Sequence, residues 1–232
     1  FAGDVFDDAE LTVASPGVAV AGPACDPAIA RARAAGKEII GDVELFARHL
    51  NALDQGRRPQ VIGITGSNGK STVTAMAGAM CRAAGVKTTV AGNIGLPVLD
   101  ALAEGEKSGV PDVYVLELSS FQLETTSNLH LAAAAMLNLS QDHLDRYDSM
   151  DAYAQAKKRI FLNAATQVLN RDDPASMKMC ESGKRVVTFG ADGSTGAGQF
   201  GLSGGHLCEG ALPLMRLEDM PVAGLHNAAN AL

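Results

Sequence analysis

The chain has 232 residues, 47% of them hydrophobic, and a formal net charge of −7. This length is long for one domain and short for two complete ones, and the apolar fraction is enough for a sizeable core. The negative charge argues against a nucleic-acid or anionic-membrane surface, so a nucleotide would have to be held by local donors. No apolar run is long enough to span a membrane, and we expect no membrane insertion.

The four cysteines, Cys25, Cys81, Cys180 and Cys208, are scattered without a C-x-x-C pair. At this chain length and spacing we expect free thiols in a reducing compartment rather than disulfides. Residues 1–4 contain neither a basic region nor an apolar core, so they do not indicate a signal peptide, and there is no initiator Met. We therefore expect the chain to begin partway through a longer protein.

The first fifty residues predict a β-α-β-α arrangement. In chain order, we expect its elements at residues 11–14, 27–35, 38–40 and 43–53. Asp26 and Asp42 are the expected N-caps of the two helices. This piece is small for a domain, so we interpret residues 1–55 as part of a larger domain. A polar linker at 54–59 then leads into a second domain, residues 56–232.

From residue 60 onward, apolar strands alternate with helices. We expect strands at 61–65, 87–91, 113–118, 133–137, 167–170 and 186–189, and helices at 71–84, 96–103, 153–163 and 174–180. This alternation predicts an α/β fold, with a P-loop-type parallel sheet and helices on both of its faces. After Gly190, β-runs at 199–202 and 212–217 predict a small antiparallel edge, followed by a last helix near His226.

The most informative segment is a glycine-rich turn between an expected strand and an expected helix. It reads Gly66-Ser67-Asn68-Gly69-Lys70-Ser71-Thr72. We expect its glycines to adopt positive φ and to bring backbone N–H groups close to an anion, at the positive end of the following helix. Lys70 can then reach the outer phosphates of a nucleotide, and Ser71 can bind Mg²⁺. Ile64 replaces the first glycine of the strict Walker A pattern, so the alternative is an ordinary strand-to-helix turn.

Three further side chains are candidates for chemistry. Glu117 lies near the carboxyl end of an apolar strand and could hold Mg²⁺, the alternative being an exposed glutamate at the sheet edge. His143 follows the next strand; it is a candidate ligand or is hydrogen-bonded to Asp142 or Asp145. Lys157 lies on the apolar side of a helix, where a lysine usually extends to the surface but can be modified if its pKa falls.

Three asparagines are weaker candidates. Asn93, in the turn Gly92-Asn93-Ile94-Gly95 after a strand, could present an amide to a ligand. Asn227 and Asn230 share one face of the last helix, where the alternative role is N-capping.

Together these segments resemble the Mur ligase family. The resemblance rests on the phosphate loop, on Ser15-Pro16-Gly17 and on the segments 41–46, 92–95, 117–124, 142–147, 153–157 and 226–230. It therefore covers nearly the whole chain. The string Leu-Ser-Ser-Phe-Gln-Leu-Glu at 118–124 is specific, and it is most similar to the branch that adds D-glutamate to UDP-N-acetylmuramoyl-L-alanine.

The resemblance implies a three-domain enzyme of peptidoglycan precursor synthesis, monomeric and in the bacterial cytoplasm. Residues 1–55 would be part of a Rossmann-like UDP-binding domain, and 56–232 the central ATPase domain. The chain departs from the family pattern by truncation, because the start of the first domain and the whole C-terminal amino-acid-binding domain are missing.

The implied reaction uses ATP to convert a substrate carboxylate into an acyl phosphate, which the amine of the added amino acid attacks. The resemblance implies catalytic roles for Lys70, His143 and Lys157, and ATP contacts from Gly66 to Thr72 and from Asn227 and Asn230. Two Mg²⁺ ions would be held by Ser71, Glu117, His143 and a carbamylated Lys157. The substrate would be bound by Ser15, Gly17, Asn93, Ser119 and His143.

Two alternatives stay open. One is a sibling ligase or a folylpolyglutamate synthase with another acceptor, against which the string 119–122 argues. The other is a nucleotide-binding regulatory module without turnover. The presence of Lys70, Glu117, His143 and Lys157 together argues against such a degenerate module.

Overall fold

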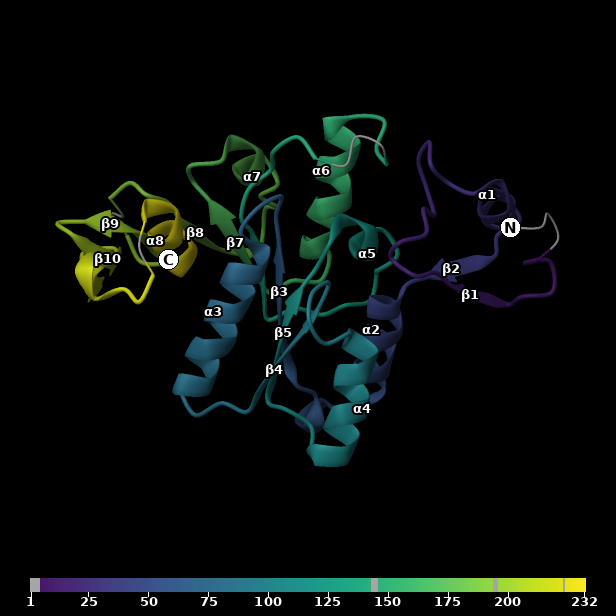
Figure 1. Ribbon diagram of the computed structural model, residues 1–232, viewed down its shortest axis with the longest axis horizontal. Coiled ribbons are helices and arrows are strands. Elements are labelled where there is room, and N and C mark those ends of the chain that lie inside the picture. The colour runs from purple at the N-terminus through teal and green to yellow at the C-terminus, as the bar shows by residue number, and fades with distance from the viewer. Residues whose placement is uncertain (1–4, 143–145, 194–195, 223) are drawn as a thin grey trace.

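The computed structural model describes residues 5–142, 146–193, 196–222 and 224–232. Its strands are β1 Leu11–Val13, β2 Glu38–Ile40, β3 Gln60–Thr65, β4 Thr88–Gly92, β5 Val113–Glu117, β6 Ala133–Met136, β7 Thr166–Asn170, β8 Arg185–Phe189, β9 Gln199–Ser203, β10 His206–Glu209 and β11 Leu212–Arg216. Nine of them form one sheet in the order β11-β10-β9-β8-β7-β6-β3-β5-β4, and β1 and β2 form a separate small sheet (Figure 1).

The helices alternate with these strands as expected. They are α1 Pro27–Ala34, α2 Asp42–Ala52, α3 Lys70–Ala83, α4 Val98–Ser108, α5 Ser120–Glu124, α6 Met150–Lys158, α7 Pro174–Lys178 and α8 Leu225–Ala231, with 3₁₀ turns at Gln55–Arg57, Arg159–Phe161 and Leu217–Asp219. The expected linker thus contains a short 3₁₀ turn. The expected helix at 153–163 begins three residues earlier and ends in a 3₁₀ turn.

The main sheet is parallel from β4 to β9. The predicted antiparallel edge is confirmed, because β10 pairs antiparallel with both β9 and β11. The sequence analysis missed β10, which lies between two tight glycine turns. Gly205 and Gly210 have φ of 78° and 55° in these turns, a conformation that favours glycine.

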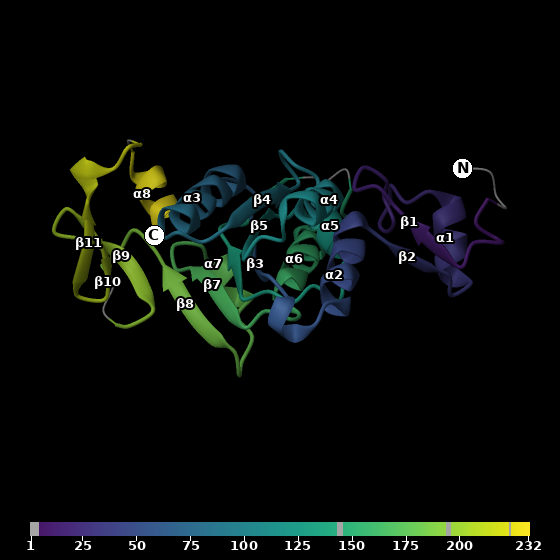
Figure 2. The ribbon, with the colours of Figure 1, turned by 90° about the horizontal axis from the view of Figure 1, so that it is seen from below.

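Helices cover both faces of the main sheet, as expected. Apolar side chains of α2, α4, α5 and α7 pack on one face, in a core that includes Phe46, Val98, Leu123 and Leu169. Val73 and Ala77 of α3 pack on the other face with Ile64 and Val115. Figure 2 shows α8 beside α3. The central strands β5 and β6 are therefore buried between two helical layers, which suits their nearly continuous apolar sequences.

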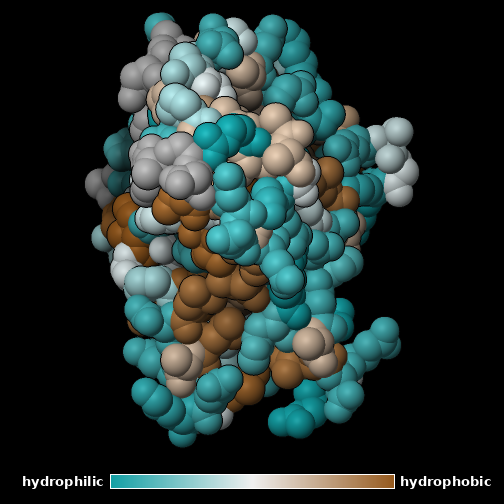
Figure 3. Space-filling view, turned by 90° about the vertical axis from the view of Figure 1, so that its right-hand side faces the viewer, coloured by the Kyte–Doolittle hydropathy of each residue, from teal (hydrophilic) through white to brown (hydrophobic). Residues whose placement is uncertain are grey.

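The N-terminal segment has its own small core at one end of the molecule. Ala14, Val20 and Ile29 form this core. The face of the molecule seen from this side shows an apolar area (Figure 3). Leu11 and Val13 of β1 are exposed.

Helix α2 also packs on the main sheet. The rings of Phe46 and Tyr114 meet edge to face at 5.1 Å. The start of α2 corrects one expectation: its N-cap is Gly41, not Asp42, which is the first helical residue. Asp26 is confirmed as the N-cap of α1, because its side chain accepts a hydrogen bond from the Ala28 N–H at 2.8 Å.

The four cysteines are free, as expected. Among the described residues, no helix combines the length and the apolar character needed to cross a membrane.

Candidate active site

The candidate site lies where three neighbouring parallel strands end. β3 lies between β5 and β6 in the sheet, so the loops that follow these strands meet at one edge. The carboxyl ends of parallel strands are the usual position for ligands in open α/β sheets. The phosphate loop follows β3, Glu117 ends β5, and Asn138 lies just after β6.

The phosphate loop leads directly into α3. Gly69 is the N-cap of this helix, with a φ of 82°, and no side chain caps the helix. The first-turn N–H groups of a helix have no carbonyl partner within the helix, so they can bind an anion. Gly66 differs from expectation, because it is not among the positive-φ glycines. Gly66 is instead required by the limited space around it, because a Cβ there would lie 3.0 Å from the Leu137 Cβ.

Lys70 folds back over the loop. Its Nζ donates hydrogen bonds to the carbonyls of Gly66 and Ser67, both at 3.0 Å. A cavity of about 270 Å³ beside it is lined by residues 67–72 together with Asn93, Ile94 and Glu117. The phosphate loop, the predicted metal ligand Glu117 and Asn93 therefore face the same space.

Glu117 is only 2% exposed and is held by Asn93. The Nδ2 of Asn93 donates to the Glu117 carboxylate at 3.0 Å, and its backbone N–H donates to the Glu117 carbonyl at 2.8 Å. Gly92 permits this approach, since a Cβ there would lie 2.2 Å from the Glu117 carbonyl oxygen. Asn93, predicted as a substrate contact, thus lies at the predicted metal site.

The donor set fits Mg²⁺. Mg²⁺ typically binds through one or two carboxylates and keeps its remaining positions for water and phosphate oxygens. Among the described residues, no group of three or more His, Cys, Asp or Glu side chains could hold a metal ion. A single buried carboxylate, Glu117, beside the Ser71 hydroxyl is a donor set of the kind used in phosphoryl transfer.

Lys157 lies on the apolar face of α6, as predicted, and its side chain is buried rather than extended to the surface. It is 2% exposed, donates to the Gly66 carbonyl at 2.8 Å and lies 4.8 Å from the centre of the Tyr153 ring. Lys70 donates to the same carbonyl oxygen. Burial, and then the charge of Lys70, lower the pKa of Lys157 to about 7. The neutral amine is therefore well populated near neutral pH.

Besides Asn93, the predicted substrate residues that the structure describes lie on two further segments. Ser15 and Gly17 follow β1, and both are exposed. Ser119 is the N-cap of α5 and forms a capping box with Gln122: its Oγ accepts from the Gln122 N–H at 3.2 Å. The sequence analysis missed α5, although the Ser-x-x-Gln spacing is a capping-box signal.

Arg146, which the sequence analysis did not single out, connects these two segments. Its guanidinium donates to the carbonyls of Gly17 and Val18 at 3.3 and 3.4 Å. The same group stacks 3.9 Å above the ring of Phe121 in α5. Arg146 therefore fixes the loop that contains Ser15 and Gly17 against the helix that Ser119 begins.

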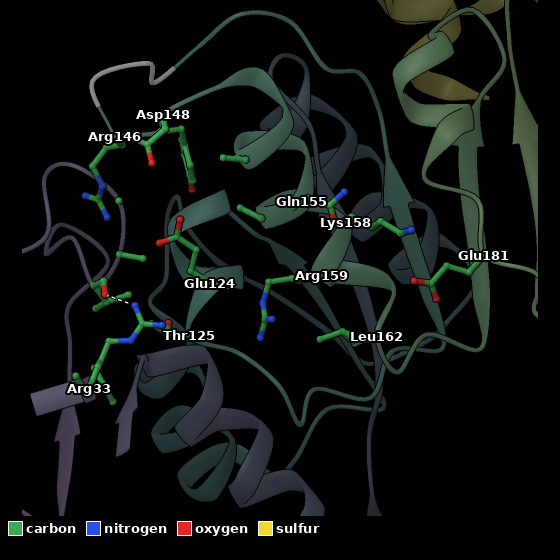
Figure 4. Close-up of a pocket in the computed structure, with 17 residues that line it drawn as sticks. Arg33, Glu124, Thr125, Arg146, Asp148, Gln155, Lys158, Arg159, Leu162 and Glu181 are labelled. Atoms are coloured by element: carbon green, nitrogen blue, oxygen red, sulfur yellow. Dashed lines mark hydrogen bonds between the residues drawn. The ribbon is translucent and has the colours of Figure 1, made fainter. Parts of the chain in front are cut away.

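A second cavity, of about 720 Å³, lies between the N-terminal segment and helices α5 and α6 (Figure 4). Its wall includes Arg33, Arg146, Arg159 and Glu124. Burial raises the pKa of Glu124, against the opposing effect of the arginines. Arg159 donates to the carbonyls of Leu123 and Thr126 at 2.7 and 2.8 Å, so it supports α5 from within the chain.

The last helix comes close to the phosphate loop. The Asn230 Oδ1 lies 3.1 Å from the position that a Cβ on Gly69 would take. Asn227 lies one turn earlier in α8, and the N-cap of α8 is Gly224, so Asn227 is not an N-cap. His143, predicted as a catalytic, substrate and metal residue, lies outside the described residues.

The fold and the site together define an α/β domain with a P-loop-type loop between β3 and α3. Residues 64–232 match the Mur ligase middle domain, and the chain belongs to the Mur ligase family. It is 57% identical over 234 residues to the UDP-N-acetylmuramoylalanine–D-glutamate ligase of Thiobacillus denitrificans, covering 97% of this chain and 48% of that protein. It is 52% identical over 236 residues to the protein of the same name from Methylobacillus flagellatus, covering 100% of this chain and 49% of that protein.

Solved structures share the fold at low sequence identity. A UDP-N-acetylmuramoyl-L-alanyl-D-glutamate–2,6-diaminopimelate ligase matches with a TM-score of 0.66 and 20% identity, over 95% of this chain and 55% of that one. A bifunctional folylpolyglutamate synthase/dihydrofolate synthase matches with a TM-score of 0.55 and 20% identity, over 82% and 56%. The chain spans about half the length of the relatives named above.

Proposed function

We propose that this chain is the nucleotide-binding part of an ATP-dependent ligase that adds D-glutamate to UDP-N-acetylmuramoyl-L-alanine in peptidoglycan precursor synthesis. The observation that carries the proposal is the meeting of Lys70, Glu117 and Lys157 around one phosphate loop. Relatives 57% and 52% identical to this chain bear the name of that ligase. A monomeric, cytoplasmic bacterial enzyme remains the expectation from the family.

The residues of the loop suit transfer of a phosphoryl group from ATP to a carboxylate. The N–H groups at the start of α3 and the Lys70 ammonium offset negative charge on the phosphates, including the charge that develops as the bond to the leaving oxygen breaks. The carboxylate gains the phosphoryl group and becomes an acyl phosphate. The amine of D-glutamate then attacks the acyl carbon, and phosphate leaves as the amide forms.

We propose Ser71 and Glu117 as residues that hold Mg²⁺, which, when bound, neutralises charge on the phosphates. Lys157 is proposed to be carbamylated and to contribute to a second Mg²⁺ site with His143. Carbamylation requires a neutral amine, and the lowered pKa of Lys157 supplies one. The modification would also replace one of the two ammonium groups that face the Gly66 carbonyl with an anionic oxygen ligand. Incubation with ¹³C-labelled bicarbonate should give a carbamate carbon signal that Lys157→Met lacks.

The remaining assignments are also proposals. Residues 1–55 are assigned to a UDP-substrate-binding domain and 56–232 to the ATPase domain. Ser15, Gly17, Asn93, Ser119 and His143 are proposed to bind the substrate. The contacts of Arg146 with the loop after β1 and with α5 support a substrate site formed by both segments. ATP contacts are proposed from residues 66–72, Asn227 and Asn230.

The test is an assay of phosphate release by the full-length enzyme with ATP, Mg²⁺, UDP-N-acetylmuramoyl-L-alanine and a panel of amino acids. We expect release and amide formation to depend on D-glutamate. A preference for another amino acid, or for a folate acceptor, would instead support a sibling ligase or a folylpolyglutamate synthase. Nucleotide binding without any turnover would support a regulatory module.

A further inference from the structure

The loop after β6 runs alongside the phosphate loop. β6 lies beside β3, and their hydrogen bonding continues past the ends of both strands. The Leu137 N–H donates to the Thr65 carbonyl at 3.0 Å, and the Ser67 N–H donates to the Asn138 carbonyl at 2.9 Å. The two segments are thus paired up to the tip of the phosphate loop.

The Asn138 side chain extends this pairing by one more residue. Its Oδ1 accepts from the Asn68 N–H at 2.9 Å, and its Nδ2 donates to the Asn68 carbonyl at 3.0 Å. One amide side chain therefore satisfies the whole backbone of one loop residue, as a neighbouring strand would do. The sequence offers no local signal for this role, because Asn after a strand is common in turns.

Ser140 holds the same part of the loop. Its N–H donates to the Ser67 Oγ at 3.0 Å, and that hydroxyl lies 3.1 Å from the Ser140 carbonyl and 3.2 Å from the Tyr153 hydroxyl. The Asn68 Nδ2 donates to the Ser140 Oγ at 3.2 Å. Ser67 is only 8% exposed, so its hydroxyl lies between these partners rather than in the open part of the site.

We propose that Asn138 and Ser140 are positioning residues for nucleotide binding, which fix Ser67 and Asn68 as the rigid side of the phosphate loop. The phosphates are then received by the backbone N–H groups of residues 70–72 and by the Lys70 ammonium. The N–H groups of Ser67 and Asn68 are already donated to Asn138, whereas those of the first turn of α3 have no partner within the helix. A loop that is already held in its nucleotide-binding conformation loses less conformational freedom when the nucleotide binds.

This inference rests on the proposed function and revises it, since Ser67 and Asn68 would support the loop rather than contact ATP through their side chains. The test is calorimetric titration of this chain with ADP and Mg²⁺. We expect Asn138→Ala to raise the Kd at least about tenfold, because two hydrogen bonds that shape the site are lost. We expect Asn68→Ala to have a smaller effect, because the backbone contacts with Asn138 remain. In Asn138→Ala, the Asn68 amide should also exchange its hydrogen faster.

Asn163→Ala is the matched control. The Asn163 Nδ2 donates to the Ser127 carbonyl at 2.7 Å, and the backbone carbonyl of Asn163 accepts from the Leu131 N–H. Leu131 lies just before β6, so Asn163 is at the amino ends of the strands, opposite to the phosphate loop. The Kd of this variant should stay within about twofold of the wild-type value. If Asn138→Ala is poorly folded, Ser140→Ala should still weaken binding by roughly two- to fivefold, through loss of one side-chain acceptor.

The possible results separate the two proposals. A wild-type chain that does not bind ADP would contradict the proposed function. A wild-type chain that binds, with Asn138→Ala and Ser140→Ala binding equally well, would overturn the positioning role alone. A larger loss of affinity in Asn68→Ala than in Asn138→Ala would also overturn it, because Asn68 would then contact the nucleotide directly.

Discussion

At the scale of single residues, the site places two lysines against one carbonyl oxygen. The Nζ atoms of Lys70 and Lys157 lie 3.0 and 2.8 Å from the Gly66 oxygen. Two ammonium groups this close repel each other, and Lys157 is the more buried of the two. The state of lower free energy is the one in which Lys157 has lost its proton. The carboxylates of Asp142 and Glu117 oppose this effect but do not outweigh burial.

The lowered pKa of Lys157 predicts a pH-dependent stability. Between about pH 7 and the usual lysine pKa of 10.5, the unfolded chain holds a proton that the folded chain has lost, so the free energy of unfolding rises with pH. Below this window both states are protonated, and the cost of burying the ammonium is fully present. Relative to Lys157→Met, the wild type should gain stability by up to about 1.4 kcal/mol per pH unit in the window.

Urea unfolding of both proteins from pH 6.5 to 9.5, in metal-free and CO₂-depleted buffer, measures this difference. Lys158→Met is the control, because Lys158 is its half-exposed neighbour on α6 and should follow the wild-type pH profile. A stability difference between wild type and Lys157→Met that does not change with pH would contradict a lowered pKa.

Lys70 should be required for phosphoryl transfer. In the full-length enzyme, we expect Lys70→Ala to lower the rate of acyl-phosphate formation roughly 10²- to 10³-fold, since a preorganised charged donor is lost. Rapid-quench measurement of ADP formation checks this, with Lys107→Ala on the exposed side of α4 as the control. Turnover in Lys70→Ala within about threefold of wild type would mean that the loop does not act on the phosphates.

At the scale of secondary-structure elements, Glu44 attaches α2 to the loop after α5. This carboxylate is 1% exposed, and it accepts hydrogen bonds from the N–H groups of Ser127 and Asn128 at 2.8 and 3.0 Å and from Arg48 at 3.0 Å. Burial alone would raise the pKa of Glu44, but these hydrogen bonds hold it below its usual value.

Glu44→Ala should therefore destabilise the chain by about 2–4 kcal/mol, because two backbone N–H groups and Arg48 lose a buried carboxylate partner. Glu38 offers a matched control, since it pairs with the same arginine on the surface. Glu38→Ala should cost less than about 1 kcal/mol. Urea denaturation midpoints measure both, and equal losses would show that the attachment of α2 does not depend on Glu44.

Some of these elements and contacts could be predicted from the sequence, and others could not. The parallel strands and the phosphate loop were predictable, because apolar runs and a Gly-Lys-Ser-Thr turn are local signals. Helical periodicity predicted that Lys157 lies on the apolar side of its helix, but not whether its amine reaches the surface. Asn138 and Arg146 were not predictable, since each acts on a residue about seventy or more positions away, Asn68 and Gly17 respectively. A requirement for glycine at position 66 was predicted, but on the basis of its backbone conformation. In the structure, the requirement comes from Leu137, which follows the neighbouring strand and leaves little room for a Cβ.

At the scale of the whole molecule, the residues of the proposed nucleotide site lie within 56–232, whereas the proposed substrate site also includes residues of the N-terminal segment. The phosphate loop, Glu117 and Lys157 lie at the edge of the main sheet, whereas Ser15 and Gly17 belong to the N-terminal segment (Figure 1). The strands and helix that carry the phosphate loop and Glu117 pack in the core of the main sheet. We therefore expect nucleotide binding and ligation to be separable.

A polypeptide of these 232 residues should bind an ATP analogue in a Mg²⁺-dependent manner and form little or no amide. The phosphate loop, its supporting contacts from Asn138 and the buried Glu117 all belong to this polypeptide, so we expect it to bind the analogue, if weakly. Ligation needs the carboxylate substrate and the amino acid held together beside the nucleotide, and the chain spans only about half the length of the ligases it resembles. Calorimetry with the analogue, with and without EDTA, measures the first property, and a ligation assay with D-glutamate measures the second. Ligation at the rate of the full-length enzyme would show that these 232 residues contain the complete active site, and the two activities would then not be separable.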